Sequence, residues 1–264
     1  MTLGMITCNY YMRIYGYEAQ EAFDWQRMCA KWRAEFDEPA FLELAAGIRA
    51  LGYDGLEIWE PTYSHKRYSE ARAAALRGRL EGLGFTSIAY CIGGWGAGDV
   101  DQVEPAYRFA RALGAEVVAG CVPLAEADAI LPTVDAMGRK YGIRYAIENH
   151  PHPSAESPDE VLALIAPYET VGANVDVGIY HQMGYDAVGA VDRFGAKVYH
   201  CHFKDTVRGE GPCRPIGDGD APMAGVYARL RELGYAGMVS VEFEHPTDPT
   251  EGLIKSIGYV RSLG

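Results

Sequence analysis

The sequence predicts a single α/β domain over residues 1–264, folded as a (β/α)8 TIM barrel. Eight apolar segments that can form strands alternate with eight that can form helices, at intervals of roughly thirty residues, about one strand–helix unit each. The predicted strands are apolar through their middles, as in a parallel sheet covered by helices. The length of 264 residues also fits, because such a barrel typically needs about 250.

The strands are located by glycines that follow the predicted helices. Each glycine comes directly after Leu, Tyr, Val or Phe and before an apolar run, so we expect the left-handed backbone of a helix C′ position there. These glycines are Gly52, Gly84, Gly114, Gly142, Gly172, Gly195 and Gly234. Together with an N-terminal strand, the pattern predicts strands over residues 4–9, 56–59, 85–91, 116–121, 143–150, 174–177, 197–203 and 238–243.

Helices are predicted between these strands. The run Ser157-Pro158-Asp159-Glu160 is a well-formed helix start, with a capping serine, a proline at the first helical position and a carboxylate at the third. The alternative architecture, an open doubly wound sheet, would carry a Gly-rich phosphate turn after its first strand, and this chain has none there. The predicted helices cover residues 39–51, 68–83, 100–113, 125–141, 158–166, 185–194, 222–233 and 250–263.

An aromatic-rich insertion at about residues 10–38 separates the first strand from its helix. One interpretation is an extra helix packed on the barrel. The other is a cover over the C-terminal mouth, in which aromatic faces stack on a sugar ring. The insertion contains Tyr10, Tyr11, Tyr15, Tyr17, Phe23, Trp25, Trp32 and Phe36.

The composition argues against nucleic acid and membranes as partners. The formal net charge is −12, which repels phosphate backbones and anionic lipid surfaces. No apolar run approaches the ~18 residues needed to span a bilayer. The six cysteines are dispersed without a CxxC pair, and the chain enters its first predicted strand with no room for a leader. We therefore expect a reducing, cytoplasmic setting.

Chemistry is expected at the C-terminal strand ends, where barrels of this kind place their active sites. Side chains alternate faces along a strand, so residues two apart share a face. Several carboxylates converging there would repel one another strongly unless a cation neutralised them. Oxygen-rich ligation with one imidazole suits Mn²⁺, Co²⁺, Mg²⁺ or Fe²⁺ and is less typical of structural Zn²⁺. The pairs that share a face are Glu148 with His150, Asn174 with Asp176, His200 with His202, and Glu242 with Glu244.

The strand-end motifs resemble those of the xylose isomerase-like TIM-barrel superfamily, which includes ketose 3-epimerases, inosose isomerases and dehydratases. The matching residues are Glu148 in Ile-Glu-Asn-His, Asp176 in Asn-Val-Asp-Val-Gly, His202 in His-Cys-His-Phe-Lys-Asp and Glu242 in Ser-Val-Glu-Phe-Glu. The resemblance implies that these four bind one divalent cation, commonly Mn²⁺, with Zn²⁺ also among the candidates. It further implies that Glu148 and Glu242 flank the substrate carbon and move protons.

The chain departs from this superfamily at the expected substrate contacts. Many relatives carry a histidine three residues after the strand-six aspartate, where this chain has Ile179. His181 is the candidate to replace it. An arginine after strand seven usually grips the substrate, and both Arg208 and Arg214 are candidates. The long insertion after strand one is also unlike the compact members.

The expected reaction is proton abstraction next to a carbonyl through an enediolate. A metal ion acts as a Lewis acid on the carbonyl, and a carboxylate or imidazole removes the proton. His150 shares the face of Glu148 and suits an acid or base role. On strand two, Glu57 and Trp59 point inward and are candidates for sugar contacts, with packing and helix capping as an equal alternative. Lys204 and Asp205 are expected to pair at the mouth.

Isomerisation or epimerisation of a keto-sugar or keto-glycoside is the favoured function. The main alternative is a lyase or deglycosidase that cleaves an O- or C-linked 3-keto-glycoside by metal-assisted elimination, in which the insertion receives the aglycone and a small partner subunit is needed. A homo-oligomer is expected by analogy with relatives. Phosphodiester repair is disfavoured by the seven histidines and the −12 charge. A sugar-binding regulatory protein without catalysis is the remaining alternative.

Overall fold

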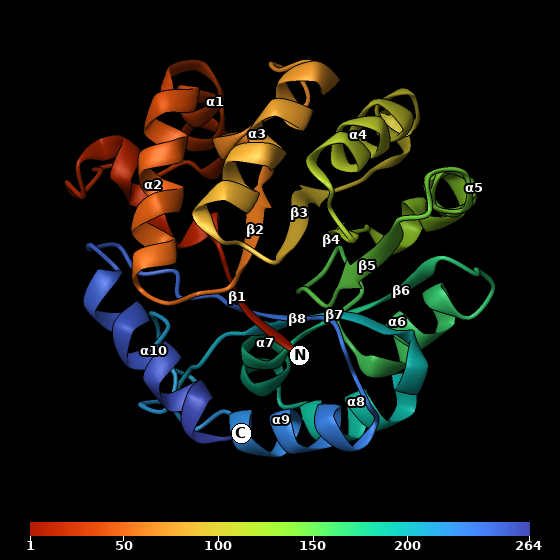
Figure 1. Ribbon diagram of the computed structural model, residues 1–264. Helices are drawn as coiled ribbons and strands as arrows, with labels where there is room; N and C mark the ends of the chain where they lie inside the picture. The colour runs from red at the N-terminus through yellow and green to blue at the C-terminus, as the bar shows by residue number, and fades with distance from the viewer.

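The computed structural model describes residues 1–264 and confirms the predicted (β/α)8 barrel. Its eight strands are parallel, pair in chain order and close through β8 against β1 (Figure 1). The strands are β1 (Thr2–Ile6), β2 (Gly55–Trp59), β3 (Ser87–Gly94), β4 (Val117–Cys121), β5 (Arg144–Glu148), β6 (Val171–Asp176), β7 (Val198–Phe203) and β8 (Met238–Val241).

A ring of helices surrounds the sheet on its outer side, and α7 lies inward of this ring, next to β7 (Figure 1). Eight of them correspond to the predicted helices, while α1 and α7 are additional. No helix combines the length and the apolar character that crossing a membrane requires. The α-helices are α1 (Trp25–Glu35), α2 (Glu38–Ala50), α3 (Glu70–Leu83), α4 (Val100–Leu113), α5 (Ala127–Tyr141), α6 (Pro158–Ile165), α7 (Val177–Met183), α8 (Ala187–Phe194), α9 (Met223–Glu232) and α10 (Thr250–Ser262).

Six of the seven glycines expected after helices have the predicted positive φ. Gly172 is the exception, because it lies inside β6, where it pairs with Ala146. A side chain at this position would overlap the Lys197 carbonyl and the Tyr199 ring. The glycine therefore permits close packing of β6 and β7 rather than a turn, and the prediction for it was wrong.

The predicted strand bounds differ most where polar side chains end a strand. β1 stops at Ile6 because the chain turns into a 3-10 helix, η1 (Thr7–Tyr15). β6 ends at Asp176, whose carboxylate accepts a hydrogen bond from the Ile179 backbone N at 2.8 Å and so caps α7. This helix was not expected from the sequence, since its first residues read as an apolar strand end.

The interior of the barrel changes character along its axis. Its N-terminal half is filled by small apolar residues and one methionine: Ala89, Val117, Ala119, Ala146 and Met238. Its C-terminal half is polar and fully buried, with Glu57, Asn174, His200, His202 and Ser240 each no more than 1 % exposed. The main apolar core, 66 buried residues, lies instead between the sheet and the helices. The buried polar half must satisfy its charges internally, because water does not reach it.

Two asparagines join neighbouring strand ends around the mouth. Asn9 donates to the Val241 carbonyl at 3.0 Å and accepts from the Phe243 N–H at 2.6 Å. Asn149 makes the equivalent pair of bonds with the carbonyl and N–H of Asp176, at 3.1 and 2.8 Å. Each side chain continues the sheet hydrogen bonding beyond the last strand residue, so the strand ends are held in register where the polar side chains project.

The insertion forms helix α1, which packs over the end of β2 and its short 3-10 turn η2 (Glu60–Thr62). Trp32 is fully buried, and Arg33 pairs with Glu60 at 2.6 Å. Phe23 and Trp25 remain 45 % and 41 % exposed. The insertion therefore contains the extra packed helix that one interpretation expected. Its second expected role, as an aromatic cover over the mouth, stays a prediction.

Candidate metal centre

Four buried side chains at the C-terminal end of the barrel form one cluster of metal-type donors. Glu148 ends β5, Asp176 ends β6, His202 lies near the end of β7, and Glu242 follows β8. One donor atom from each lies within 4.8 Å of the donor atoms of the others. None of the four residues is more than 7 % exposed. The structure thus brings together the four residues that the sequence predicts as ligands.

Strand register explains why these side chains converge. Asp176 lies opposite His202 in the β6–β7 pairing, and Glu148 lies opposite Asn174, two residues earlier on β6. Because alternate residues share a face, Glu148, Asp176 and His202 all point into the barrel. Glu242 joins them from β8, where its N–H donates to the Phe203 carbonyl at 3.0 Å.

The donor atoms of this cluster fit a divalent cation. Buried polar atoms normally have hydrogen-bond partners, yet Asp176 Oδ2 and Glu242 Oε2 accept no well-aligned hydrogen bond. Their nearest cationic neighbours are Lys204, 3.5 Å from Asp176 Oδ2, and His202 Nδ1, 2.8 Å from Glu242 Oε2. Asp176 Oδ1 is held by the Ile179 backbone N, which fixes the carboxylate and leaves Oδ2 available. Three carboxylates and one imidazole are the donor types that suit Mn²⁺, Co²⁺, Fe²⁺ or Mg²⁺. The residues present could therefore hold one such ion.

The electrostatics of the cluster also favour an added cation. Burial raises the pKa of Asp176 to about 7 despite the nearby Lys204 ammonium, and the charges of Glu242 and Glu148 act in the same direction as burial. Burial alone would raise the pKa of Glu242 as well, but Lys204 and His202 outweigh it and the pKa falls to about 2. One carboxylate is thus stabilised by existing cations, while Asp176 still lacks a sufficient counter-charge.

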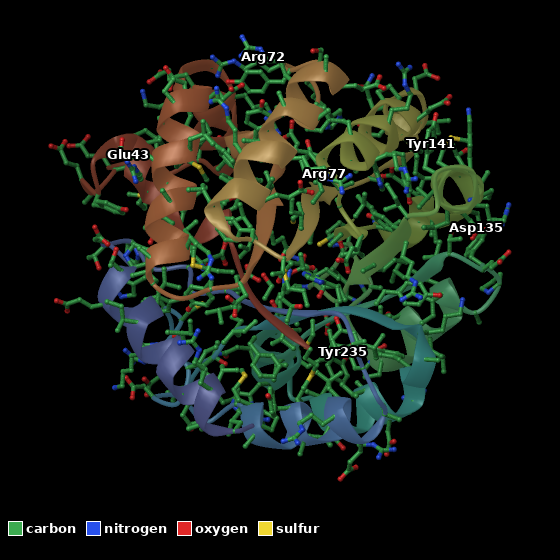
Figure 2. All side chains as sticks on the ribbon, in the orientation of Figure 1. Glu43, Arg72, Arg77, Asp135, Tyr141 and Tyr235 are labelled. Carbon is green, nitrogen blue, oxygen red and sulfur yellow. The ribbon has the colours of Figure 1, made fainter.

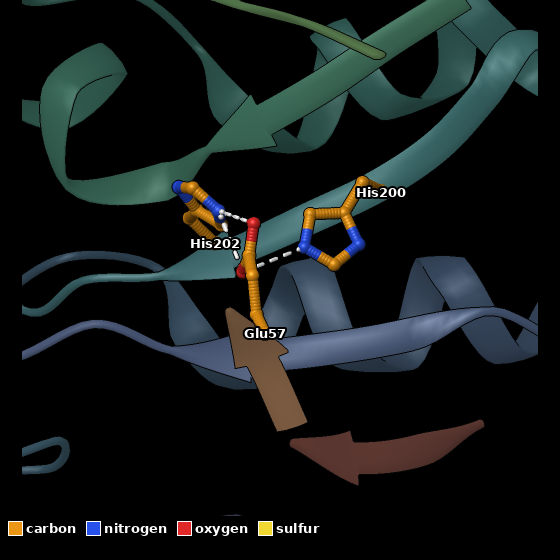
Figure 3. A group of neighbouring side chains, drawn as sticks. All are labelled: Glu57, His200 and His202. Atoms are coloured by element: carbon orange, nitrogen blue, oxygen red, sulfur yellow. Dashed lines mark hydrogen bonds and ion pairs between the residues drawn. The ribbon is translucent and has the colours of Figure 1, made fainter. Parts of the chain in front are cut away.

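His202 is shared between this cluster and a second carboxylate deeper in the barrel. Its Nδ1 lies 3.2 Å from Glu148 Oε1 and 2.8 Å from Glu242 Oε2. Its Nε2 lies 3.1 Å from Glu57 Oε2, and the same oxygen lies 2.9 Å from His200 Nε2 (Figure 3). Burial would lower the pKa of His202, but Glu57, Glu242 and Glu148 together hold it well above its usual value.

The position of Glu57 does not fit its predicted role as a sugar contact. This residue is 0 % exposed and lies between the two histidines of β7, as Figure 3 shows, so it cannot reach a sugar hydroxyl. Its pKa is well below the usual range because His200 and His202 outweigh the effect of burial. A carboxylate that binds the far nitrogen of a ligand histidine fixes its orientation and leaves the other nitrogen for the metal. Glu57 is therefore placed to orient His202, should that residue bind a metal.

Lys204 does not pair with Asp205, contrary to the sequence expectation. Its ammonium lies 2.8 Å from Glu242, 3.0 Å from Glu244 and 3.5 Å from Asp176. Asp205 instead accepts hydrogen bonds from backbone N–H groups, including those of Thr206 at 2.9 Å and of Gly217 at 2.8 Å. The lysine could have been identified from the alternation rule, because Lys204 shares a face with His202.

Trp59 is also not available for the predicted ring contact with a sugar. It is 4 % exposed, and its ring lies 5.8 Å from that of Trp25 and 6.3 Å from that of Trp32. The insertion therefore covers the tryptophan that the sequence alone places at the mouth. The reason is tertiary, since helix α1 packs on the end of β2.

The other predicted substrate contacts lie outside the donor cluster. His150 is exposed, and its backbone N–H donates to the Ala155 carbonyl. His181 Nε2 lies 2.6 Å from Asp220 Oδ1 rather than facing the cluster. Arg208 donates to the backbone carbonyl of His181 at 3.1 Å. Arg214 pairs with Glu210 at 3.1 Å. The structure brings none of these four side chains to the cluster. Local partners in α7 and the 204–220 loop hold His181, Arg208 and Arg214.

A large hollow in the molecule lies away from this cluster. It measures about 640 Å³ and lies at the N-terminal end of the barrel, bordered by Arg77, Arg111 and Arg144. Arg77 is labelled in Figure 2, on the outer ring of helices. Chemistry in this fold takes place at the opposite end, so size alone does not identify the functional pocket.

Comparison with known proteins identifies a family. The family model of xylose isomerase-like TIM barrels matches residues 45–263 of this chain. A protein of Streptomyces coelicolor provisionally named hydroxypyruvate isomerase is 24% identical over 253 residues. The match covers 81% of this chain and 89% of that protein.

Solved structures of two epimerases share the barrel. L-ribulose 3-epimerase superposes with a TM-score of 0.76 at 17% identity, over 99% of this chain and 94% of the other. D-psicose 3-epimerase from Clostridium cellulolyticum H10, with D-tagatose, superposes with a TM-score of 0.75 at 14% identity, over 100% of this chain and 99% of the other. At these identities the likeness establishes the fold alone.

The role of Glu57 predicts an effect on metal affinity at a distance. Glu57→Gln keeps the side-chain shape but removes the charge that orients His202, so Mn²⁺ affinity should fall by about 10- to 100-fold. Isothermal titration calorimetry on the purified, metal-free protein measures this. Glu169→Gln, an exposed position before β6, is the matched control and should bind like the wild type. Unchanged Mn²⁺ affinity in the Glu57 variant would refute the positioning role.

The cluster also predicts pH-dependent metal binding. Because the pKa of Asp176 is raised to about 7 and that of His202 is raised well above its usual value, both groups hold protons near or below neutrality. A metal ion must displace these protons, so affinity should rise with pH, by about tenfold per unit for each proton displaced. Calorimetry in two buffers of different ionisation enthalpy counts the protons released at pH 6 and pH 8. Equal affinity at both values would contradict the expectation.

Proposed function

The chain belongs to the xylose isomerase-like TIM-barrel family, and from that premise we propose that it is a divalent-metal-dependent isomerase or epimerase of a keto-sugar or keto-glycoside. The observation that carries the proposal is the mutual approach of the donor atoms of Glu148, Asp176, His202 and Glu242 to within 4.8 Å at the barrel mouth. Related proteins named for hydroxypyruvate isomerisation and for ketose 3-epimerisation support this class of reaction.

The four residues of the cluster would hold the metal ion, and Mn²⁺ is favoured by the mixed carboxylate and imidazole donors. When bound, the ion would supply Lewis acidity that makes a proton next to a carbonyl easier to remove. The protein's contribution is to keep the donors buried and oriented. Asn149 holds the backbone of Asp176, and Glu57 holds His202.

Proton movement is assigned to the two glutamates of the cluster. Glu148 projects from β5 and Glu242 from the end of β8, so they approach a shared centre from different sides of the barrel. Lys204, at 2.8 Å, keeps Glu242 ionised and ready to accept a proton. Removal of a proton by one glutamate and return by the other would invert the carbon, which is epimerisation; return to the neighbouring carbon would be isomerisation.

His150 is proposed as an additional acid or base at the rim. Its exposed imidazole borders the same pocket as Lys204, next to the donor cluster. A group outside the ligand set can donate a proton to a departing substituent, which is the step that elimination requires. The position of His150 favours the lyase or deglycosidase alternative as a second candidate. Elimination and isomerisation begin with the same proton abstraction.

The proposal predicts exchange of a substrate C–H proton with solvent. The Mn²⁺-loaded protein, incubated in D₂O with a panel of ketoses and 3-keto-glycosides, should introduce deuterium at the carbon next to the carbonyl, detected by NMR. Glu148→Gln should slow the exchange by about 10²- to 10⁴-fold, because a base is lost. Glu169→Gln is the control and should exchange normally. Absence of exchange across the panel, with bound metal verified, would refute the proposal.

A further inference from the structure

A pocket of about 370 Å³ opens beside the donor cluster, between the residues that follow β5, helix α7 and the loop that follows β7. This hollow is termed here the Ile179 pocket, and twelve residues line it. Two are glycines (Gly178 and Gly211) and four have polar side chains (His150, Gln182, Thr206 and Glu210). The other six are Pro151, Ile179, Met183, Lys204, Pro212 and Cys213. Except for the lysine ammonium, these last six side chains offer hydrocarbon or sulfur to the interior. Met183, at the edge, is 38 % exposed, although it is a large apolar residue.

Lys204 borders both this pocket and the cluster. A Cβ added to Gly178 would approach Lys204 Cγ at 2.8 Å, so the lysine stem lies directly against the start of α7. The ammonium at the other end of the same side chain reaches Glu242 and Asp176. The stem therefore presents methylene groups to the pocket while its charge is used in the cluster.

The chemistry of the lining determines what the pocket can hold. Sugar hydroxyls placed against Ile179, Met183 and Pro212 would lose hydrogen bonds to water that these three side chains cannot replace, which is costly. An aromatic or branched aliphatic group would instead gain from burial. The volume of about 370 Å³ lies within the range of sites for small ligands. The pocket thus suits an apolar substituent attached to a sugar whose reacting carbon lies at the cluster.

We propose that the Ile179 pocket is an aglycone subsite, so that the physiological substrate is a glycoside with an apolar, preferably aromatic, aglycone rather than a free ketose. This inference rests on the proposed function, which places the reacting sugar at the cluster. It also locates the aglycone on the β5–β7 side, away from the aromatic insertion beside β2, where the sequence alone would place it.

A binding experiment tests the subsite without requiring turnover. Phenyl and methyl glycosides of glucose, galactose, mannose and xylose are titrated into the Mn²⁺-loaded protein and followed by calorimetry. We expect at least one phenyl glycoside to bind about tenfold more tightly than its methyl counterpart, because the ring is buried. In Ile179→Asn this ratio should fall to about two or less.

Ile254→Asn is the matched control, because Ile254 is 53 % exposed on α10, and it should keep the wild-type ratio. Ile179→Val should restore most of the preference if the effect is one of apolar contact. A phenyl-to-methyl ratio near one for all four sugars, or a full preference retained in Ile179→Asn, overturns the subsite. Deuterium exchange into free ketoses without any aryl preference would leave the proposed function intact and reject this inference alone. An aryl preference without deuterium exchange would support the apolar subsite and reject the proposed function.

Discussion

The site depends on the contacts of the His202 imidazole, which is buried with carboxylates next to both of its nitrogens. Glu57 holds Nε2 from within the barrel, and Glu148 and Glu242 face Nδ1 from the mouth. Such a concentration of negative charge in a water-poor interior is unfavourable unless cations balance it. His202 and Lys204 supply part of that balance. Asp176 keeps a carboxylate oxygen without a hydrogen bond and a pKa raised by burial, so the cluster is suited to a further positive charge.

Much of the fold could be predicted from the sequence because it depends on local periodicity, and the convergence of the four donor side chains could be predicted from strand alternation together with the family resemblance. Glycines after helices located the strands, and alternation placed Glu148, Asp176 and His202 on one face. Contacts between distant segments could not be predicted in this way. The burial of Trp59 under helix α1, the enclosure of Glu57 between two histidines and the turn of Lys204 away from Asp205 all depend on tertiary packing. Gly172 shows the same limit, because its conformation is set by the neighbouring strand β7.

The mouth of the barrel is divided into chemically different sides. Aromatic rings of the insertion cover the end of β2, while the β5–β7 side carries the Ile179 pocket and the exposed imidazole of His150. Lys204 connects the second side to the donor cluster. A reacting sugar at the cluster would therefore meet charged groups on its carbonyl side and apolar surface beyond Lys204. On the proposed function, this division would allow loop residues to adapt the barrel to its substrate.

Anomalous X-ray scattering from crystals soaked in Mn²⁺ tests the central claim most directly, because it locates the ion independently of activity. The account predicts one strong peak enclosed by Glu148, Asp176, His202 and Glu242, at metal–ligand distances of about 2.0–2.5 Å. It also predicts that His202 binds through Nδ1, with Nε2 still held by Glu57. A peak at another place, or no peak in the cluster at millimolar Mn²⁺, would contradict it.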